Sequence, residues 1–286
     1  MNRQQLIAIV CALWSIWQPA ASQERYTRED SLFVTKALTE ARSLPPTTNY
    51  PLHFARLLIG RPYVGHTLEV GDSEQLVVNT RQLDCTTLVE TVTALSLCAY
   101  RRLYSWRDYL NALAGMRYRH GRIEGYTSRL HYFSDWIDDN TRKGLVKEVQ
   151  QPNPPFTAVQ TLDIHYMSRH PQAYKALKAH PEMVAEIATL EDALTGRRYR
   201  YIPKGGMTDT KAMRNAVRDG DIIAITCNKD GLDIAHLGFA VWRADGLHLL
   251  NASQIHKKVV EEPMTLPRYL SKHPTHTGIR IVRIQK

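Results

Sequence analysis

The sequence predicts an α+β fold in which a helical first part is followed by an antiparallel sheet. Apolar residues recur at helical spacing early in the chain, most clearly at Leu88, Val92, Leu95 and Ala99. Over about the last seventy residues the apolar period changes to two, which predicts strands at 221–227, 235–242, 247–252 and 279–284. Residues 243–246 lie between two of these strands and predict a hairpin.

The first 22 residues predict a secretory signal peptide. Arg3 supplies a positive charge, residues 6–17 form an apolar run, and Pro19 begins a small-residue exit that ends at Ser22. This run is shorter than the ~20 residues that span a bilayer, although a single-pass anchor is the alternative interpretation. We therefore expect a periplasmic or secreted protein with no stable membrane insertion after cleavage.

Residues 23–286 are enough for one sizeable core, and we expect a single domain with a helical insertion around 101–215. Ahead of this insertion, one helix should start near Thr27 and a second should cover residues 52–59. Inside it, the pattern from 105 to 213 is mostly helical, with a proline-rich linker at 151–155 and one or two helices across 174–194.

The charge of the chain gives little support to nucleic-acid binding. The sequence has 37 basic and 28 acidic residues, a net charge of +9, and the basic residues are spread along its length. A basic exported protein is attracted to anionic polymers such as the carboxylates of peptidoglycan. A generally basic, solvated surface explains the charge equally well.

The cysteine count leaves at least one free thiol. Once the predicted signal peptide is removed, three cysteines remain, which cannot all pair: Cys85, Cys98 and Cys227. Cys85 and Cys98 are thirteen positions apart in one predicted helix, roughly 20 Å along its axis, which forbids a disulfide between them. Cys98 is expected to be a buried core residue.

Cys85 is the candidate nucleophile, because it lies at the start of that helix. The dipole and the free N–H groups of a helix N-terminus lower the pKa of a thiol, and the same N–H groups can stabilise an oxyanion. A cysteine at a helix start is more often structural than catalytic. The assignment therefore needs a base and a residue that orients the base.

His236 and Asn251 are the candidates for these two roles. On the strand 235–242 the alternate residues expected to face the core are Leu237, Phe239 and Val241. His236 would then point away from the apolar side, where the small Gly238 leaves room for a substrate. An even hairpin loop places Asn251 on the same face as His236 and diagonal to it, whereas an odd loop turns Asn251 away. There it would contribute about one net hydrogen bond, ~1 kcal/mol, to stability.

Five short motifs, in order, resemble those of the NlpC-type cell-wall hydrolase superfamily: 60–65 (GRPYVG), 84–89 (DCTTLV), 220–223 (GDII), 236–239 (HLGF) and 250–253 (LNAS). The order Cys then His matches the unpermuted members. The resemblance implies a papain-like fold, with Cys85 on a helix N-terminus and His236 on the adjoining antiparallel sheet. The third polar residue of that family is often His and is Asn251 here, and Thr86-Thr87 replace the usual Ser-Gly after the cysteine.

Two of the segments, 82–90 (QLDCTTLVE) and 125–133 (GYTSRLHYF), are similar to one branch of that superfamily, the N-acetylmuramoyl-L-alanine amidase-like group. The resemblance implies hydrolysis of the amide bond between N-acetylmuramoyl and L-alanine, with peptidoglycan or a muropeptide as the partner. We also expect Tyr63, a candidate substrate-binding residue, to help the backbone N–H of Cys85 to hold the oxyanion. Arg129 and His131 are candidate substrate-binding residues, with surface packing as their alternative role.

Asp84 leaves a second activity open. In endopeptidase relatives an Asp before the cysteine helps to hold a free peptide amine, which would make this protein a γ-D-glutamyl–diaminopimelate endopeptidase of the same fold. The alternative role of Asp84 is the N-cap of the Cys85 helix. A catalytically silent peptidoglycan-binding module is a third possibility, against which the complete Cys, His and Asn set argues.

No cofactor and no metal are expected. The sequence has no His-Glu-x-x-His run, and the spacings of three other histidines do not place them on one helix face: His165, His170 and His180. A zinc amidase is therefore disfavoured.

Overall fold

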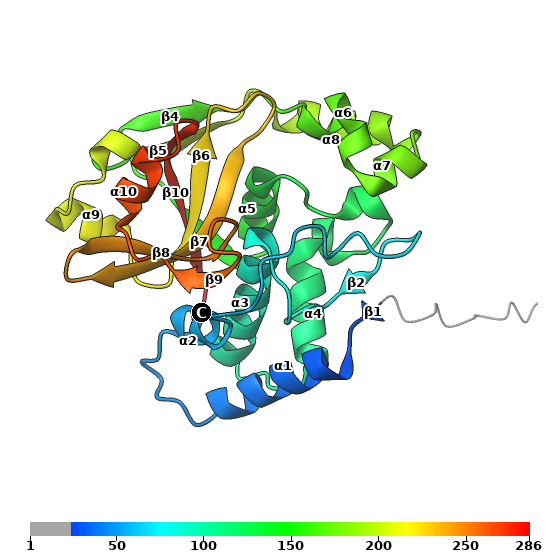
Figure 1. The fold of residues 1–286 in the computed structure, drawn as a ribbon, viewed down its shortest axis with the longest axis horizontal. Helices are drawn as coiled ribbons and strands as arrows, with labels where there is room; N and C mark the ends of the chain where they lie inside the picture. Colours follow the sequence, from blue (N-terminus) through cyan, green and yellow to red (C-terminus); the bar gives the residue numbers. More distant parts are fainter. Residues whose placement is uncertain (1–23) are drawn as a thin grey trace, which may run out of the picture.

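The computed structural model describes residues 24–286. The predicted signal peptide at 1–22 therefore lies outside the described residues. The described chain forms an eight-stranded sheet with helices on both of its faces, which confirms the α+β class and the antiparallel sheet (Figure 1). Within residues 24–286, no helix is long and apolar enough to cross a membrane.

The helices of the first part form where the sequence predicts them. They are α1 (Arg28–Ala41), α2 (Tyr50–Leu57), α3 (Cys85–Tyr100) and α4 (Trp106–Arg117). Each begins at a polar side chain that accepts a hydrogen bond from a free N–H of the first turn, namely Thr27, Asn49, Asp84 and Ser105. These caps satisfy donors that have no partner inside the helix and so fix where each helix starts.

The helix α3 is buried on all sides from Thr87 to Ala99. It packs against α1, α2 and α4 and against the strands β7 and β8. A helix that is apolar all round belongs in a core, so α3 holds its first residue, Cys85, at a fixed place against the sheet. Cys98 lies in the same helix and is buried, as expected.

The main sheet has the strand order β4-β5-β10-β6-β7-β8-β9, with β3 pairing with β10. Four of its strands match predicted ones: β6 (Ile222–Cys227), β7 (Ile234–Arg243), β8 (Gly246–Ser253) and β10 (His276–Ile284). In the β7–β8 hairpin Trp242 pairs with Leu247, so the loop is even. A separate two-stranded parallel sheet joins β1 (Glu24–Arg25) to β2 (Leu76–Val77).

Four strands of the main sheet, besides the short β1 and β2, were not predicted. β3 (Val146–Val149), β4 (Ala158–Thr161) and β5 (Arg198–Pro203) interrupt the region 105–213, which the sequence pattern describes as mostly helical, and β9 (Lys258–Glu261) follows the hairpin. These strands have four to six residues, too few for a clear period-two signal. Because β3 and β5 pair with β10, part of this region belongs to the main sheet.

Both faces of the sheet are covered by apolar layers. Leu237 and Phe239 pack in the core cluster that contains α3, whereas Ala240 and Leu249 pack in the cluster that contains α9 (Lys211–Ala216) and α10 (Leu266–Ser271). His236 lies on the face opposite Leu237 and Phe239, as expected, but the implication that this face is free of an apolar layer is wrong, because it also lies under a helical layer.

The expectation that Gly238 leaves room for a substrate is also wrong. A Cβ added at Gly238 would lie 2.6 Å from the carbonyl oxygen of Leu250 and 2.7 Å from Cδ1 of Leu249. The neighbouring strand β8 already fills this space, so the glycine permits a close approach of backbone and side chain rather than a binding pocket.

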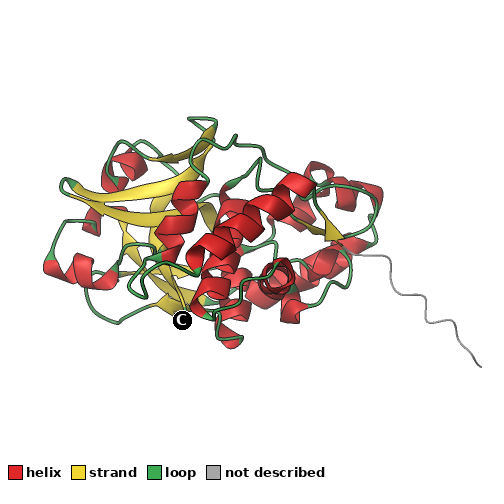
Figure 2. Ribbon diagram, turned by 90° about the horizontal axis from the view of Figure 1, so that it is seen from below, coloured by secondary structure: helices red, strands yellow, loops and turns green. Residues whose placement is uncertain are grey.

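A further group of helices has its own small core at one end of the molecule. It consists of α6 (Tyr166–Arg169), α7 (Lys175–Ala179) and α8 (Met183–Leu194), at the upper right of Figure 1. The hydroxyl of Tyr132 ties this group to α5 (Phe133–Arg142) by donating to Glu191 at 2.6 Å. Seen from below, the sheet lies to one side and most of the helices lie to the other (Figure 2).

Candidate active site

The local sequence around Cys85 fixes its position at the first residue of α3. The Asp84 carboxylate accepts the N–H of Thr87 at 2.8 Å, and the Thr87 hydroxyl accepts the N–H of Asp84 at 2.9 Å. This reciprocal pair is a capping box. Asp84 therefore has the N-cap role that was one of its two interpretations.

The Cys85 side chain is half-buried. Burial raises the pKa of its thiol to about 12, and the charge of Asp84 acts in the same direction. Hydrogen bonds from Thr86 and from the backbone N–H of Leu237 lower this pKa but do not offset burial. The expectation that the helix N-terminus gives a lowered pKa is therefore wrong in the resting protein. The bond from Leu237 places the sulfur against β7, one residue from His236.

His236 and Asn251 lie together as the even loop predicts. His236 Nε2 is 3.0 Å from Asn251 Oδ1, with the histidine on β7 and the asparagine on β8. An amide oxygen only accepts, so in this contact Nε2 carries the ring proton and Nδ1 keeps a lone pair. Burial lowers the pKa of His236, and the hydrogen bond to Asn251 opposes that effect. The lowered pKa favours the neutral ring, in which Nδ1 is the nitrogen not engaged by Asn251.

Cys85 and His236 open into one cavity of about 150 Å³. His131, one of the predicted substrate-binding residues, lines the same cavity. Its Nε2 donates to the carbonyl of Tyr126 at 2.9 Å, and burial lowers the pKa of His131 to about 3. The ring is thus neutral, with its orientation set by the Tyr126 backbone.

Tyr63 lies near Cys85. Its backbone bridges to Leu83, two residues before Cys85. Burial raises the pKa of the Tyr63 hydroxyl to about 12, and the neighbouring Cys85 and Asp84 raise it further. The phenol is consequently a hydrogen-bond donor next to the thiol and the start of α3.

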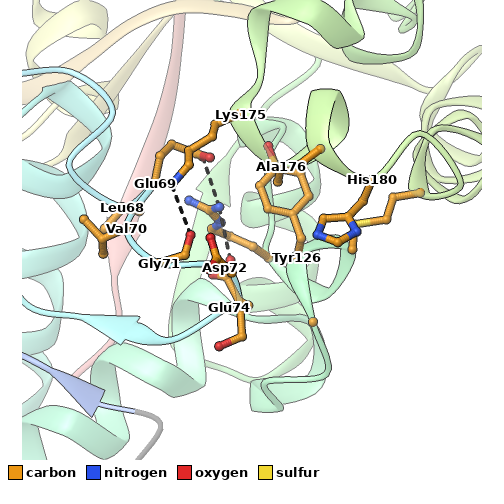
Figure 3. A pocket seen from close by; sticks show the side chains of 15 residues that line it. Leu68, Glu69, Val70, Gly71, Asp72, Glu74, Tyr126, Lys175, Ala176 and His180 are labelled. Carbon is orange, nitrogen blue, oxygen red and sulfur yellow. Dashed lines mark hydrogen bonds and ion pairs between the residues drawn. The ribbon is translucent and has the colours of Figure 1, made fainter.

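Arg129 lies in a different, larger cavity of about 290 Å³ (Figure 3). Its guanidinium contacts Glu69 and Glu74 at 3.2 Å each and stacks over Tyr126 at 4.9 Å. The ring of Tyr126 also contacts His131, with 4.4 Å between the ring centroids. Tyr126 therefore stands between the two cavities, and the structure divides the predicted pair, with His131 in the cavity of Cys85 and Arg129 in the neighbouring one.

Two residues near the site were missed by the sequence analysis. Tyr269 of α10 stacks on the ring of His236, with 6.4 Å between centroids. Glu262 is buried and accepts a hydrogen bond from Nδ2 of Asn251 at 3.3 Å. The sequence offers one clue to Glu262, namely that it follows Asn251 closely enough to return beside it on the next strand. This clue can be used only once β9 is known to pair with β8.

A family model described as N-acetylmuramoyl-L-alanine amidase-like matches residues 53–279. The chain belongs to this family. An N-acetylmuramoyl-L-alanine amidase from Bacteroides uniformis is 41% identical, with a TM-score of 0.78, and the match covers 83% of this chain and 98% of that one. A Bacteroides fragilis structure with a provisional xylanase name is 42% identical, with a TM-score of 0.76, covering 82% and 100%.

A protein from Legionella pneumophila shares the fold at 22% identity, with a TM-score of 0.68 and coverage of 90% of this chain and 95% of that one. Among curated proteins, none matches the chain. The amidase-like family is the branch that the motifs predicted, and it indicates a hydrolase that acts on peptidoglycan-type substrates. The matched residues 53–279 include all of the candidate site residues.

Proposed function

We propose that the protein is a cysteine amidase that hydrolyses the bond between N-acetylmuramoyl and L-alanine in muropeptides. The observation that carries this proposal is the juxtaposition of Cys85, His236 and Asn251 in a member of the amidase-like family. Its fold would be papain-like and of the NlpC type. That assignment is supported by the cysteine at the N-terminus of a central helix and by the histidine and asparagine on adjacent antiparallel strands.

In the proposed mechanism, Nδ1 of His236 takes the thiol proton as the sulfur of Cys85 attacks the amide carbon. The carbonyl oxygen becomes an oxyanion, which the backbone N–H of Cys85 and the hydroxyl of Tyr63 would stabilise. The protonated His236 then gives its proton to the leaving nitrogen of L-alanine, and the C–N bond breaks. Water hydrolyses the remaining thioester, with His236 again acting as the base.

Asp84 bears on the choice between the amidase and the endopeptidase. Its Oδ1 accepts both the N–H and the hydroxyl of Thr87, so this carboxylate oxygen is already engaged in the cap. The cap leaves Oδ2 without a hydrogen-bond partner among the described residues, so it does not decide against a γ-D-glutamyl–diaminopimelate endopeptidase, which would use Asp84 to bind a peptide amine. The amidase is favoured instead by the family match. A silent binding module would need neither the thiol nor the oriented histidine.

His131 and Arg129 are proposed to bind the two sides of the scissile bond from their neighbouring cavities. The support for this is that the ring of Tyr126 contacts both side chains, which places His131 and Arg129 in one cluster. The predicted signal peptide would deliver the enzyme to the periplasm or the outside of the cell, where such substrates occur.

The test is mass spectrometry of purified muropeptides digested with residues 23–286. The amidase releases a free stem peptide that begins with L-alanine, and Cys85→Ala should release none. A dipeptide left on the sugar would identify the endopeptidase instead. Digestion by Cys85→Ala at the wild-type rate would refute the cysteine mechanism.

A further inference from the structure

We propose that Glu262 is a positioning residue that fixes the amide of Asn251 and thereby sets the tautomer of His236. The inference rests on the proposed function, because it assigns Glu262 a part in preparing the general base. Glu262 itself contacts neither Cys85 nor any reacting atom in that mechanism.

The strand register places Glu262 beside Asn251. Asn251 of β8 is opposite Val260 of β9, so the residue two positions after Val260 lies on the same face and diagonal to Asn251. His236 has the same diagonal relation to Asn251 across β7 and β8. His236 of β7, Asn251 of β8 and Glu262, directly after β9, thus form a single line of polar side chains across the sheet.

The hydrogen bonds along this line have a fixed direction. An ionised carboxylate only accepts, so Glu262 Oε1 requires the N–H₂ side of the Asn251 amide, which lies 3.3 Å away. The amide oxygen must then face His236 Nε2, at 3.0 Å. Nε2 consequently carries the proton, and Nδ1 is the nitrogen left to accept one. Without the carboxylate, the amide could turn over and present its N–H₂ group to the ring, which would favour the opposite tautomer.

The second oxygen of Glu262 is held as well. His256 Nε2 lies 3.2 Å from Glu262 Oε2, and its ring covers the carboxylate from the protein surface. The Glu262 side chain is only 1% exposed, and a buried charge is costly unless it is paired or hydrogen-bonded. Oε2 is therefore occupied by His256, and Oε1 is the oxygen that contacts Asn251.

The backbone of Glu262 has separate structural bonds. Its N–H donates to the carbonyl of Leu249 at 2.8 Å, and its carbonyl accepts from His248 Nδ1 at 2.9 Å. Glu262→Gln keeps both bonds and the side-chain shape. In this variant an amide that can both donate and accept replaces the carboxylate, so the orientation of the Asn251 amide is no longer fixed. The backbone bonds, and with them the strand, stay in place.

The charge of Glu262 should also affect how kcat/KM depends on pH. Besides Asn251, the groups that act on or pack against His236 are Glu262, His273, Asp84, Tyr269 and His276. Of these, the carboxylates raise the pKa of His236, whereas His273 lowers it. Loss of the Glu262 charge should thus move the acidic limb of kcat/KM to lower pH. A purely structural role for Glu262 would change the amount of folded protein but would not shift this limb.

The first experiment measures the tautomer without using activity. In wild-type protein, ¹⁵N NMR of the histidine rings should show His236 protonated at Nε2 near neutral pH, and Glu262→Gln should show a mixture of both tautomers. The His236 signals can be assigned by their loss in His236→Gln. A wild-type ring protonated at Nδ1, or an unchanged ring in Glu262→Gln, would overturn the proposal.

The second experiment is a double-mutant cycle on kcat. Glu262→Gln should lower kcat on the order of 100-fold with little change in KM, less than the ~10⁴-fold known for a wrong histidine tautomer in a serine protease. In the Asn251→Ala background it should have almost no further effect, since it acts through Asn251. Independent, multiplying effects of the two changes would contradict the proposal.

Glu261→Gln is the matched control, because this neighbouring carboxylate pairs with Arg56 and Arg243 instead of with Asn251. It should leave kcat and the His236 tautomer unchanged. The proposed function is tested by a different variant, and it is refuted if Cys85→Ala is active. With Cys85→Ala inactive and Glu262→Gln at the wild-type rate, only the role of Glu262 is refuted.

Discussion

Replacing Asn251 with alanine separates the orientation of the base from the stability of the sheet. Asn251 is fully buried, and the change leaves the Nε2–H of His236 without a partner and removes one of the two side-chain contacts of Glu262, whose other oxygen His256 still holds. The unpaired N–H costs about 1–3 kcal/mol, and the lost hydrogen bond of Glu262 costs about 1 kcal/mol. We therefore expect a loss of ~2–4 kcal/mol in the free energy of unfolding, more than the ~1 kcal/mol of an isolated hydrogen bond on a sheet face.

The effect of this change on turnover should be larger than its effect on stability. Losing the orientation of a catalytic histidine lowers kcat by ~10³–10⁴-fold, which corresponds to about 4–5.5 kcal/mol in activation free energy. Muropeptide hydrolysis and thermal unfolding would be measured on the same samples, well below the melting temperature. Asn251→His should retain part of the activity, because the imidazole introduced at position 251 can also accept the Nε2–H of His236.

Asn140→Ala is the control for Asn251→Ala. Asn140 is also fully buried, and its amide donates to the carbonyls of Met116 and Trp136, away from the candidate site. It should lower the melting temperature without changing turnover per folded molecule. Wild-type turnover in Asn251→Ala would refute the orienting role, and Ser253 would be the next residue to examine.

Three further predictions follow from the same structure. Thiol alkylation should abolish activity, whereas a chelator should not. The alkylation rate of Cys85 should rise toward alkaline pH, because burial raises the pKa of this thiol to about 12. Loss of activity with EDTA and its rescue by zinc would contradict this prediction. The free energy of unfolding should fall as the pH falls from about 6.5 toward 4. In the folded protein the pKa values of His131 and His276 are lowered to about 3 and about 4, so over this pH range the two histidines bind protons in the unfolded chain and not in the folded one. The slope should approach ~1.4 kcal/mol per pH unit for each histidine, and His131→Gln should reduce it. Glu90→Gln should lower the free energy of unfolding by about 3–5 kcal/mol, measured by denaturant titration. The change leaves the buried Arg117 guanidinium without the carboxylate that it contacts at 2.7 Å. A loss below 1 kcal/mol would show that Arg117 finds another partner.

The helix starts and the hairpin could be predicted from the sequence because both depend on local physics. A capping residue satisfies N–H groups of its own first turn, as Asp84 does for α3. The register of the β7–β8 hairpin depends only on the length of its loop, and that register brings Asn251 to His236. Short-range rules were therefore enough to place the histidine beside its partner.

What the sequence did not predict depends on contacts between distant segments. Glu262 is a candidate for the site only because β9 pairs with β8, and four residues carry too weak a pattern to predict that strand. The crowding at Gly238 comes from Leu249 and Leu250 across the hairpin, and the covering of the His236 face comes from α10. Burial of this kind is a property of the packed molecule.

The same dependence on packing decides how Cys85 can act. A helix N-terminus favours a thiolate, yet burial acts against the charged form of both partners, raising the pKa of the thiol and lowering the pKa of His236. Both shifts favour the neutral thiol with the neutral imidazole. In the proposed mechanism the proton would then move as the sulfur attacks, with a free nitrogen of the neutral imidazole facing the thiol beforehand. On the proposed mechanism, reactivity should depend less on the dipole of α3 than on Asn251 of β8 and on Glu262, directly after β9, which we propose hold the ring in one tautomer.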